Sequence, residues 1–452
     1  MKLAASPQTL AAFRIAVGFS LLLSSEIHSA PRFAALAPAL RIAPEGLGWF
    51  FAIVPVSETL ARAAVAVAMF GAVATMVGIY TQVAAPLLAA SAFYLLGLGQ
   101  LSGTVVHDMH LVWFAAILAV SPCADVWSFD AWWSARESNE PRGVVVDPAT
   151  RASAVAVAVW TARALFACIY FFPGFWKVAT QGLDWALSDN LSYQLYWKWF
   201  EWGEVPAFRL DQHPGLLKAG GSSVLAFELG FPLLLLTWRT RLLAAAFGLA
   251  FHLASERFFR IPFSSLWLCY PVLLDFPLSR GAPGPSPSPA RWMRTLSLEV
   301  IVCAALVVGA VVQGARAKTD AFPFACYPTF QYHPPRDVPD LRIVAVTPDG
   351  TSVEVAHARN GAGVRAQARW GQIWALVGAT EPVVESRLFE YAVSEVAANP
   401  SAFATADRVE MFRTHYSVVP EARGRGPTAT TQLASFPIAK IRERLLQPRS
   451  TP

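Results

Sequence analysis

Charged residues are scarce in this sequence. Its 36 Lys and Arg and 31 Asp and Glu make up 15% of 452 residues, whereas an ordinary soluble domain has roughly a quarter. Hydrophobic residues reach 55%. This composition excludes disordered, collagen-like and disulfide-scaffold proteins, because such chains lack the apolar runs that recur here. It is typical of a protein that crosses a membrane several times.

Cysteines are few, and several catalytic motifs are missing. No CxxC pair or Cys/His cluster has the spacing of a zinc site, so no metal is predicted. The chain has no GxxxxGKS/T phosphate loop, no GxGxxG after a strand, no HExxH and no GxSxG. These absences disfavour an ATP-driven pump, a dinucleotide enzyme and a serine hydrolase. No stripe of Lys and Arg alternates with exposed aromatics, so no nucleic-acid partner is expected. The cysteines are Cys123, Cys168, Cys269, Cys303 and Cys326.

The charge that is present is distributed unevenly. Residues 314–452 hold 29 charged side chains, about 21% of that segment, and the first 313 residues hold the other 38, about 12%. The first two thirds of the chain therefore suit lipid and the last third suits water. We predict an all-α polytopic membrane bundle followed by a small α+β domain.

Eight or nine apolar runs are long enough to be candidate membrane spans. They define a transmembrane domain over 1–280, a Pro/Gly/Ser-rich linker over 281–296, a last transmembrane helix over 297–313 and a soluble domain over 314–452. The candidate spans are 8–25, 61–80, 83–101, 107–121, 154–174, 222–237, 241–254, 262–276 and 297–313.

The tail has its own pattern. Strand-like runs cover 341–346, 352–356 and 364–377, with a Pro-Asp-Gly turn signal between the first two, and 385–397 is expected to be helical. Basic residues in short loops tend to stay in the cytoplasm. With nine spans, that tendency places the tail on the extracytoplasmic side.

The segment 175–221 is rich in tryptophan. Trp prefers the membrane interface, so we expect amphipathic helices along the bilayer surface that form a lid over a cavity. The tryptophans are Trp176, Trp185, Trp197, Trp199 and Trp202.

Ionisable residues inside the candidate spans are the first functional candidates. Such a group costs several kcal/mol in lipid unless it is paired, hydrated or able to reach the interface. The candidates are Arg14, Arg62, His107, Asp108, His110, Arg163, Lys177, Glu228 and His252.

Lys177 follows an aromatic stretch and a Pro-Gly break, and it has two interpretations. It is either an interfacial lysine whose ammonium reaches water, or a general base kept dry by Phe175 and Trp176. His107 begins His-Asp-Met-His, which is an incomplete metal site but suits hydrogen bonding or proton relay. Glu228 and His252 lie on consecutive spans and form either a structural pair that locks two helices or a substrate-facing acid and imidazole.

Three segments carry a resemblance to a known family. They are Val106-His107 through Val126-Trp-Ser-Phe-Asp130; Tyr170-Phe-Phe-Pro-Gly-Phe-Trp-Lys177; and Phe227-Glu-Leu-Gly-Phe-Pro232 through Phe251-His-Leu253 to Pro271. In order and spacing, these segments resemble the horizontally transferred transmembrane (HTTM) domain family, whose best-known member is the vitamin K-dependent gamma-carboxylase. The resemblance covers about residues 8–276.

The resemblance implies a chemistry. In that family a lysine after the Tyr-Phe stretch deprotonates vitamin K hydroquinone, which reacts with oxygen to give an epoxide. That role falls on Lys177, and the family's functional histidine falls on His107. The expected cofactor is a reduced quinone, either vitamin K hydroquinone or menaquinol, contacted by Glu228, His252 and Trp176. Trp176 stands where the animal carboxylase has a second lysine, and the tail is far shorter than the carboxylase's lumenal region, which argues against glutamate carboxylation.

Two functions from different classes follow. The first is a membrane enzyme with quinol oxygenation or epoxidation activity. The second is a non-catalytic membrane module whose buried polar residues hold helices together and whose external tail binds a protein partner. A solute transporter is less favoured, because no matching Gly/Pro-interrupted half-spans repeat along the chain.

Overall fold

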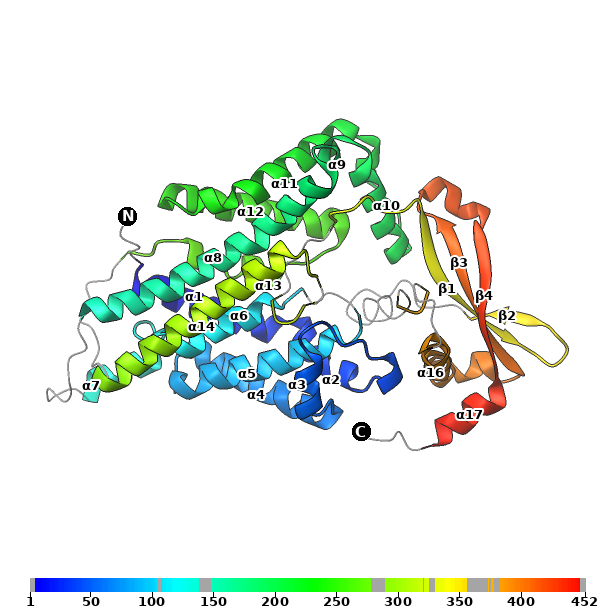
Figure 1. The fold of residues 1–452 in the computed structure, drawn as a ribbon, viewed down its shortest axis with the longest axis horizontal. Coiled ribbons are helices and arrows are strands. Elements are labelled where there is room, and N and C mark those ends of the chain that lie inside the picture. The colour runs from blue at the N-terminus through cyan, green and yellow to red at the C-terminus, as the bar shows by residue number, and fades with distance from the viewer. Residues whose placement is uncertain are drawn as a thin grey trace.

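The computed structural model describes residues 5–103, 107–137, 148–277, 289–319, 321–324, 330–355, 373, 375–377 and 383–447. A bundle of helices occupies most of the long axis, and a four-stranded sheet stands at one end of it (Figure 1). The bundle comprises α1 (Pro7–Leu23), α2 (Ser25–Ala34), η1 (Pro38–Leu40), α3 (Gly48–Ile53), α4 (Glu58–Val77), α5 (Thr81–Gln100), α6 (His110–Val120), α7 (Phe129–Glu137), α8 (Pro148–Gln181), α9 (Asp184–Leu187), α10 (Asn190–Trp202), η2 (Leu210–Gln212), α11 (Pro214–Leu234), α12 (Trp238–Phe259), α13 (Ser264–Trp267), η3 (Tyr270–Leu273) and α14 (Pro289–Ala315).

Each predicted span coincides with a helical segment, but the helices differ in length. Within the described ranges, five are long and apolar enough to cross a membrane, namely α4, α5, α8, α12 and α14. Counting α1 and α2 as one span bent by 45° gives six. The run expected over 262–276 folds as the short helices α13 and η3, too short to span a bilayer unaided. The chain is thus a multi-pass helical membrane protein, and a count of eight or nine spans stays a prediction.

α8 lies at the centre of the bundle. In its apolar stretch 67% of residues are buried, against 17% for α12, so α12 faces lipid and α8 faces other helices. α8 packs on α11 along one side and on α14 along another. The buried core continues into α1, α5 and α6. This central position makes α8 the natural carrier of a buried site.

Two arginines among the functional candidates, Arg14 and Arg163, hold the backbone of the bundle through hydrogen bonds, and so does Arg241. Arg14 is fully buried and donates to the carbonyl oxygen of Cys123 at 2.7 Å. Arg163 donates to Val272 O at 2.9 Å and to Asp275, and Arg241 also pairs with Asp275. These side chains satisfy carbonyl groups where the chain leaves helical geometry, which lipid cannot do. Another candidate, Arg62, is exposed and pairs with Glu58 one turn away.

α8 and α14 approach each other closely at a glycine. A Cβ placed on Gly314 would lie 2.2 Å from the ring of Phe172, so only glycine fits there without a shift of the ring. Small residues serve this purpose in membrane helix packing, where close approach replaces the hydrophobic driving force.

The Gly314→Ala variant is therefore expected to be less stable than wild type by about 1–3 kcal/mol, the usual cost of overpacking. Thermal unfolding in nanodiscs measures this loss. Gly230→Ala on α11 is the control, because a Cβ there meets no atom within 4 Å. Equal melting temperatures for Gly314→Ala and wild type would contradict the proposed close packing.

The C-terminal domain is a sheet covered by helices. It contains β1 (Asp337–Val346), β2 (Ser352–Glu354), α16 (Val383–Ala398), η4 (Pro400–Phe403), β3 (Arg408–Ser417), η5 (Pro420–Arg425), β4 (Ala429–Pro437) and α17 (Ile438–Leu446). The strand order is β2-β1-β3-β4, and every pairing is antiparallel. In the β1–β3 pair, the register runs from Asp337 opposite Ser417 to Val346 opposite Arg408.

The prediction for the tail is partly confirmed. The first two strands and the helix are present at the expected places. Of the strand expected over 364–377, residues 373 and 375–377 are described, and they are helical. Ile373, Leu376 and Val377 are buried in the core of this domain, and their spacing of three and four residues is that of one helix face. The other residues of that run lie outside the described part of the chain.

The C-terminal domain docks on α10. Phe200 of α10 is buried against Val338 and Val418. Arg423 donates to the carbonyl oxygen of Tyr196 at 2.6 Å, and Glu421 pairs with Arg209 at 2.7 Å. The domain also reaches the start of the chain, because Leu40 lies in its core. Its position relative to the bundle is therefore fixed by contacts at two places.

The Arg209–Glu421 contact predicts a pH-dependent contribution to docking. Hydrogen bonding from Arg209 lowers the pKa of Glu421 below its ordinary value of 4.5. A carboxylate with a lowered pKa stabilises the folded state above pH 4.5, and that contribution disappears as the pH falls through the lowered value. Since 62% of the Glu421 side chain is exposed, the effect is local and weakened by salt.

Amide hydrogen exchange at η5 is expected to increase as the pH falls from 5 to about 3, after correction for the intrinsic exchange rate. The Glu421→Gln variant should lack this additional increase. A wild-type profile identical to that of the variant would contradict the assigned role of the pair.

Candidate functional site

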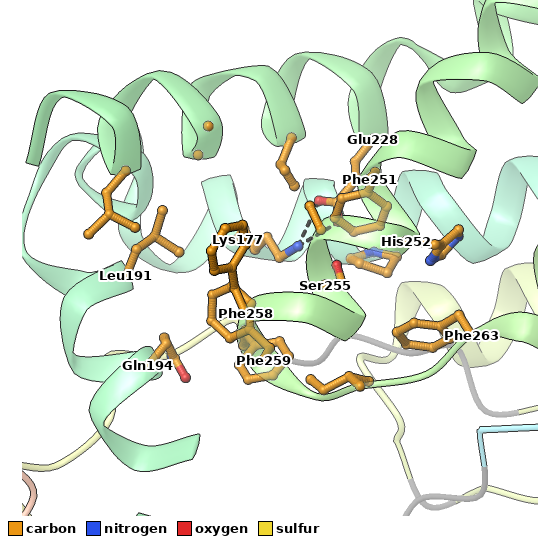
Figure 2. Close-up of a pocket in the computed structure, with 18 of the residues that line it drawn as sticks. Lys177, Leu191, Gln194, Glu228, Phe251, His252, Ser255, Phe258, Phe259 and Phe263 are labelled. Carbon is orange, nitrogen blue, oxygen red and sulfur yellow. Dashed lines mark hydrogen bonds and ion pairs between the residues drawn. The ribbon is translucent and has the colours of Figure 1, made fainter. Parts of the chain in front are cut away.

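A cavity of about 310 Å³ lies among α8, α10, α11 and α12, toward the end of the bundle that carries the C-terminal domain. Figure 2 shows Leu191 and Gln194 at one end of it and His252 and Phe263 at the other. Most lining side chains are apolar, and the few polar ones include the buried Lys177, Glu228 and His252. An apolar pocket with a few convergent polar groups is the usual form of a small-molecule site.

Lys177 and Glu228 form a buried ion pair in the wall of the cavity. Nζ of Lys177 donates to both carboxylate oxygens of Glu228, at 2.6 and 2.8 Å. The two residues are only 5% and 4% exposed. Nζ also lies 4.7 Å from the ring centroid of Trp185. The lysine therefore does not extend to water, and the interpretation of Lys177 as an interfacial lysine is wrong for this structure.

Gly174 makes this pair possible. A Cβ placed on it would lie 2.7 Å from Cβ of Glu228, so α8 and α11 approach each other closely just before Lys177. Lys177 lies three residues later, nearly one turn along α8. The Pro-Gly break in the aromatic stretch thus brings the acid of one helix to the amine of the other.

The same cavity is lined by a second polar contact, between His252 of α12 and Tyr170 of α8. Nε2 of His252 lies 2.6 Å from the hydroxyl oxygen of Tyr170, which also hydrogen-bonds Tyr270. Within the described residues, Nδ1 of His252 is buried and has no hydrogen-bond partner. One interpretation was that Glu228 and His252 form a structural pair. In the structure they are not paired with each other. Each has its own partner on α8.

His107 lines a different cavity, of about 130 Å³, together with Ser24, Glu26, Asp108 and Ser265. Glu26 accepts hydrogen bonds from the backbone N–H groups of His107 and Asp108, at 2.8 and 2.9 Å. Asp108 accepts one from Ser265 at 2.5 Å. The predicted residues His107 and Lys177 therefore lie in separate cavities.

The ring of Phe263 stands between the two cavities. Its centroid is 5.4 Å from that of His107 and 5.1 Å from that of His252. His107 thus reaches the Lys177 cavity only past Phe263.

Trp176, predicted as a cofactor contact, points toward α14. Its indole nitrogen donates to Gly314 O at 2.7 Å, and Trp176 is not among the residues that line the cavity. Trp185, from the predicted lid, lines the cavity instead. The structure therefore brings Lys177, Glu228 and His252 to one cavity and leaves Trp176 and His107 outside it.

Residues 330–335, which we call the strap, close the cavity on the side of the C-terminal domain. Side chains of α8, α9 and α10 hold the strap through its carbonyl oxygens: Thr180 to Gln331 at 2.7 Å, Gln181 to Gln331 at 2.5 Å, Trp185 to Phe330 at 2.6 Å, Gln194 to Tyr332 at 2.9 Å and Trp197 to Pro335 at 2.8 Å. The side chain of Phe330 lines the cavity. The predicted lid thus lies over a cavity, and part of the tail completes it.

Several residues of the site were not predicted. Tyr170 lies seven residues before Lys177, about two turns along the same face of α8, so its position relative to Lys177 was a usable signal. Tyr270, Gln194 and Phe330 had no such signal, because tertiary contacts bring them to the cavity. Glu26 directly follows the first apolar run, 8–25, and so fell outside the candidate spans; it could have been found only through its contact with His107.

Among the described residues, no three His, Cys, Asp or Glu side chains form a group that could hold a metal ion. The site offers a different chemistry. The pair has no net charge, so it tolerates an apolar wall. It also holds one proton that can lie on the amine or on the carboxyl group, which suits proton exchange with a ligand.

The fold and the site together define a multi-pass helical membrane protein with a buried acid-base pair in an apolar cavity. The chain belongs to the HTTM domain family, whose model matches residues 4–277. HTTM domains are membrane domains related to the vitamin K-dependent carboxylase. No curated protein and no solved structure gives a match.

A double-mutant cycle tests whether the pair is coupled. Lys177→Met or Glu228→Leu alone leaves a buried charge without its partner, which should cost about 3–5 kcal/mol of stability. The double variant should recover most of that loss, because two apolar side chains suit the apolar wall. Thermal unfolding in nanodiscs measures the loss of stability for the two single variants and the double variant. Simple additivity of the two losses would contradict the coupling.

Proposed function

We propose that the protein binds a lipid-soluble quinol in this cavity and that Lys177 removes a hydroxyl proton from it, which starts an oxygenation to the epoxide. The observation that carries the proposal is the buried Lys177–Glu228 pair in an otherwise apolar cavity of about 310 Å³. The volume is at the lower end of ligand pockets, roughly 300–1,000 Å³, and suits a flat ring system. Vitamin K hydroquinone and menaquinol are the candidate molecules.

A quinol supplies an electron-rich ring that reacts with oxygen once a hydroxyl group is deprotonated. In the proposed reaction, one oxygen molecule gives one atom to the epoxide and one to water, while the quinol loses two hydrogens. Glu228 takes the proton of the Lys177 ammonium as the ligand enters, and the neutral amine then accepts the hydroxyl proton. The dry cavity favours this exchange, because no water competes for the amine.

His252 is proposed to contact the ring at the far end of the cavity. Its Nε2 is held by Tyr170, and Nδ1 is available to hydrogen-bond a second oxygen of the ligand. His107, with Glu26, is proposed to exchange protons past Phe263 rather than to touch the ligand. Trp176 is proposed to support the site from behind through its contact with α14.

We further propose eight or nine spans; with nine, the C-terminal domain lies on the extracytoplasmic side. The basic residues of the short loops favour this orientation. The cavity would then open near the outer leaflet, beneath a C-terminal domain whose surface is available to a protein partner.

The Lys177→Ala variant is expected to lose quinol epoxidation by at least about a hundredfold, the lower range for a general base. The assay uses purified protein in lipid nanodiscs, under oxygen, with vitamin K hydroquinone and menaquinol, and detects the epoxide by chromatography. The control is Arg62→Ala, which also removes a basic residue but from the exposed face of α4, and it should keep wild-type turnover. Unchanged turnover in a folded Lys177→Ala variant would refute the role of the base.

A second function, from another class, is favoured by one observation. The Lys177–Glu228 pair and the Tyr170–His252 bond join α8 to α11 and α12, which is also what structural polar contacts do in membrane bundles. In a non-catalytic module that binds a protein through its tail, Lys177→Ala would lower the melting temperature, and wild type would neither bind nor convert quinols. Quinol turnover by wild type decides against this alternative.

A further inference from the structure

A cluster of charged side chains lies near the start of α12, outside the cavity. Arg163 of α8 and Arg241 of α12 both pair with Asp275, which follows η3. None of these three residues lines the cavity that contains Lys177. Two positive charges share one negative charge, so the cluster has one positive charge in excess. We call these three residues, together with Trp160 of α8, the arginine cluster.

The hydrogen bonds of the two arginines show which group lacks a partner. Nη1 of Arg241 donates to Leu235 O at 2.8 Å, and its Nε donates to Leu273 O at 3.1 Å. Nε of Arg163 donates to Val272 O at 2.9 Å, but its Nη1 is buried and has no acceptor in the part of the chain that the structure describes. Arg163 is 0% exposed, so bulk water does not reach this donor. A buried donor without an acceptor is costly.

Trp160 supplies a second donor at the same place. The centre of its ring lies 4.9 Å from Cζ of Arg163 and 5.8 Å from Cζ of Arg241, so the indole packs on both guanidinium groups. Its Nε1 is buried and, within the described ranges, also has no acceptor, although a buried indole N–H usually has one. Two donors without acceptors beside an excess positive charge are the groups that recognise an anion.

The arginine cluster reaches the surface at the start of an apolar, lipid-facing helix. Asp275 has 42% of its side chain exposed, and Trp160 is partly exposed. The start of α12 changes within two turns from an aromatic and a basic residue to leucines, which is the order expected where headgroups meet hydrocarbon. The exposed residues there are Trp238, Arg239, Leu242 and Leu243.

Exposed aromatic residues continue from the arginine cluster along the same end of the bundle. The ring of Trp127, which is 50% exposed, lies 5.9 Å from the ring of Phe276, the neighbour of Asp275. α7 follows in the chain with three more exposed aromatic residues. They are Phe129, Trp132 and Trp133. Aromatic residues gather at the headgroup level of a bilayer, so the arginine cluster faces lipid headgroups.

We infer that the arginine cluster binds the phosphate group of an anionic phospholipid. The phosphate lies at the surface beside Asp275 and Trp160, and a shift of the indole ring lets its oxygens accept from Nε1 of Trp160 and Nη1 of Arg163. Its charge cancels the excess positive charge. A lipid with net negative charge, such as phosphatidylglycerol, is preferred over phosphatidylcholine, whose choline group adds a positive charge. Basic pockets between membrane helices bind anionic headgroups in this way.

Free phosphate has the same hydrogen-bonding chemistry, but the headgroup level of the arginine cluster favours the lipid. The site is separate from the cavity and does not depend on the proposed quinol chemistry. A lipid bound there joins α8 to α12 and to the segment that carries Asp275, so it stabilises the folded bundle in proportion to its occupancy.

The test compares nanodiscs of phosphatidylcholine alone with nanodiscs that also contain phosphatidylglycerol. Native mass spectrometry measures the ratio of the two lipids that stay on the protein, and thermal unfolding measures stability. Wild type should retain phosphatidylglycerol preferentially and should melt at a higher temperature in its presence. Inorganic phosphate added to phosphatidylcholine nanodiscs distinguishes the free anion from the lipid. An equal rise in melting temperature with inorganic phosphate, or no lipid preference, would overturn the inference.

Trp160→Phe keeps an aromatic ring and removes the indole donor. It should lower the preference for phosphatidylglycerol by about tenfold, equivalent to about 1.4 kcal/mol, which is near the lower limit for a hydrogen bond to a charged group. Trp133→Phe is the matched control, because it removes an exposed indole of α7 outside the arginine cluster and should keep the wild-type ratio. An unchanged ratio in Trp160→Phe would contradict the site.

Asp275→Asn provides an independent test of opposite sign, also if Trp160→Phe does not fold. It removes the negative charge of the arginine cluster and leaves two positive charges, so it should raise the preference for phosphatidylglycerol by about threefold. A purely structural role of Asp275 predicts a lower melting temperature in both kinds of nanodisc and no gain in lipid preference. That result would overturn the inference.

Discussion

The structure depends on how a charged amine and a carboxylate are kept inside an apolar bundle. Neither group could stay there alone, because an isolated charge in a medium of low polarity costs several kcal/mol. Close contact of α8 and α11 at Gly174 lets the two groups neutralise each other through two hydrogen bonds. Lys177 and Glu228 also line the apolar cavity. The glycine contact thus fixes the pair in the wall of the cavity.

The C-terminal domain is part of the site rather than an appendage. It reaches the cavity through the strap, which places Phe330 among the lining residues, and it rests on α10 through Phe200, Val338 and Val418. Because α9 and α10 hold the strap and also line the cavity, a displacement of the domain would change the shape of the cavity. Membrane and water-soluble portions of the chain are therefore mechanically connected at this point.

Sequence patterns predicted what depends on local chemistry. Apolar runs predicted the positions of the helices. The free-energy cost of an ionisable side chain in lipid identified Lys177, Glu228 and His252 as candidates, and these three residues line one cavity. Partner choice was not predictable, because Glu228 meets Lys177 only through the close helix contact at Gly174. β3 and β4 were missed because their alternation is weak: Val409 and Met411 are buried in β3, but Phe436 is the one buried residue of β4. The direction of Trp176 depends on α14, more than a hundred residues later, and no local pattern contains that information.

The strap is held through its backbone, and this affects how the ligand preference of the cavity can change in evolution. The five side chains that hold it all donate to carbonyl oxygens, and every residue type has a carbonyl oxygen. The attachment of the strap therefore depends little on which side chains it carries, whereas the side chain at position 330 lines the cavity. A single substitution there can resize the chamber while the closure itself persists, so ligand choice and lid attachment are free to evolve separately.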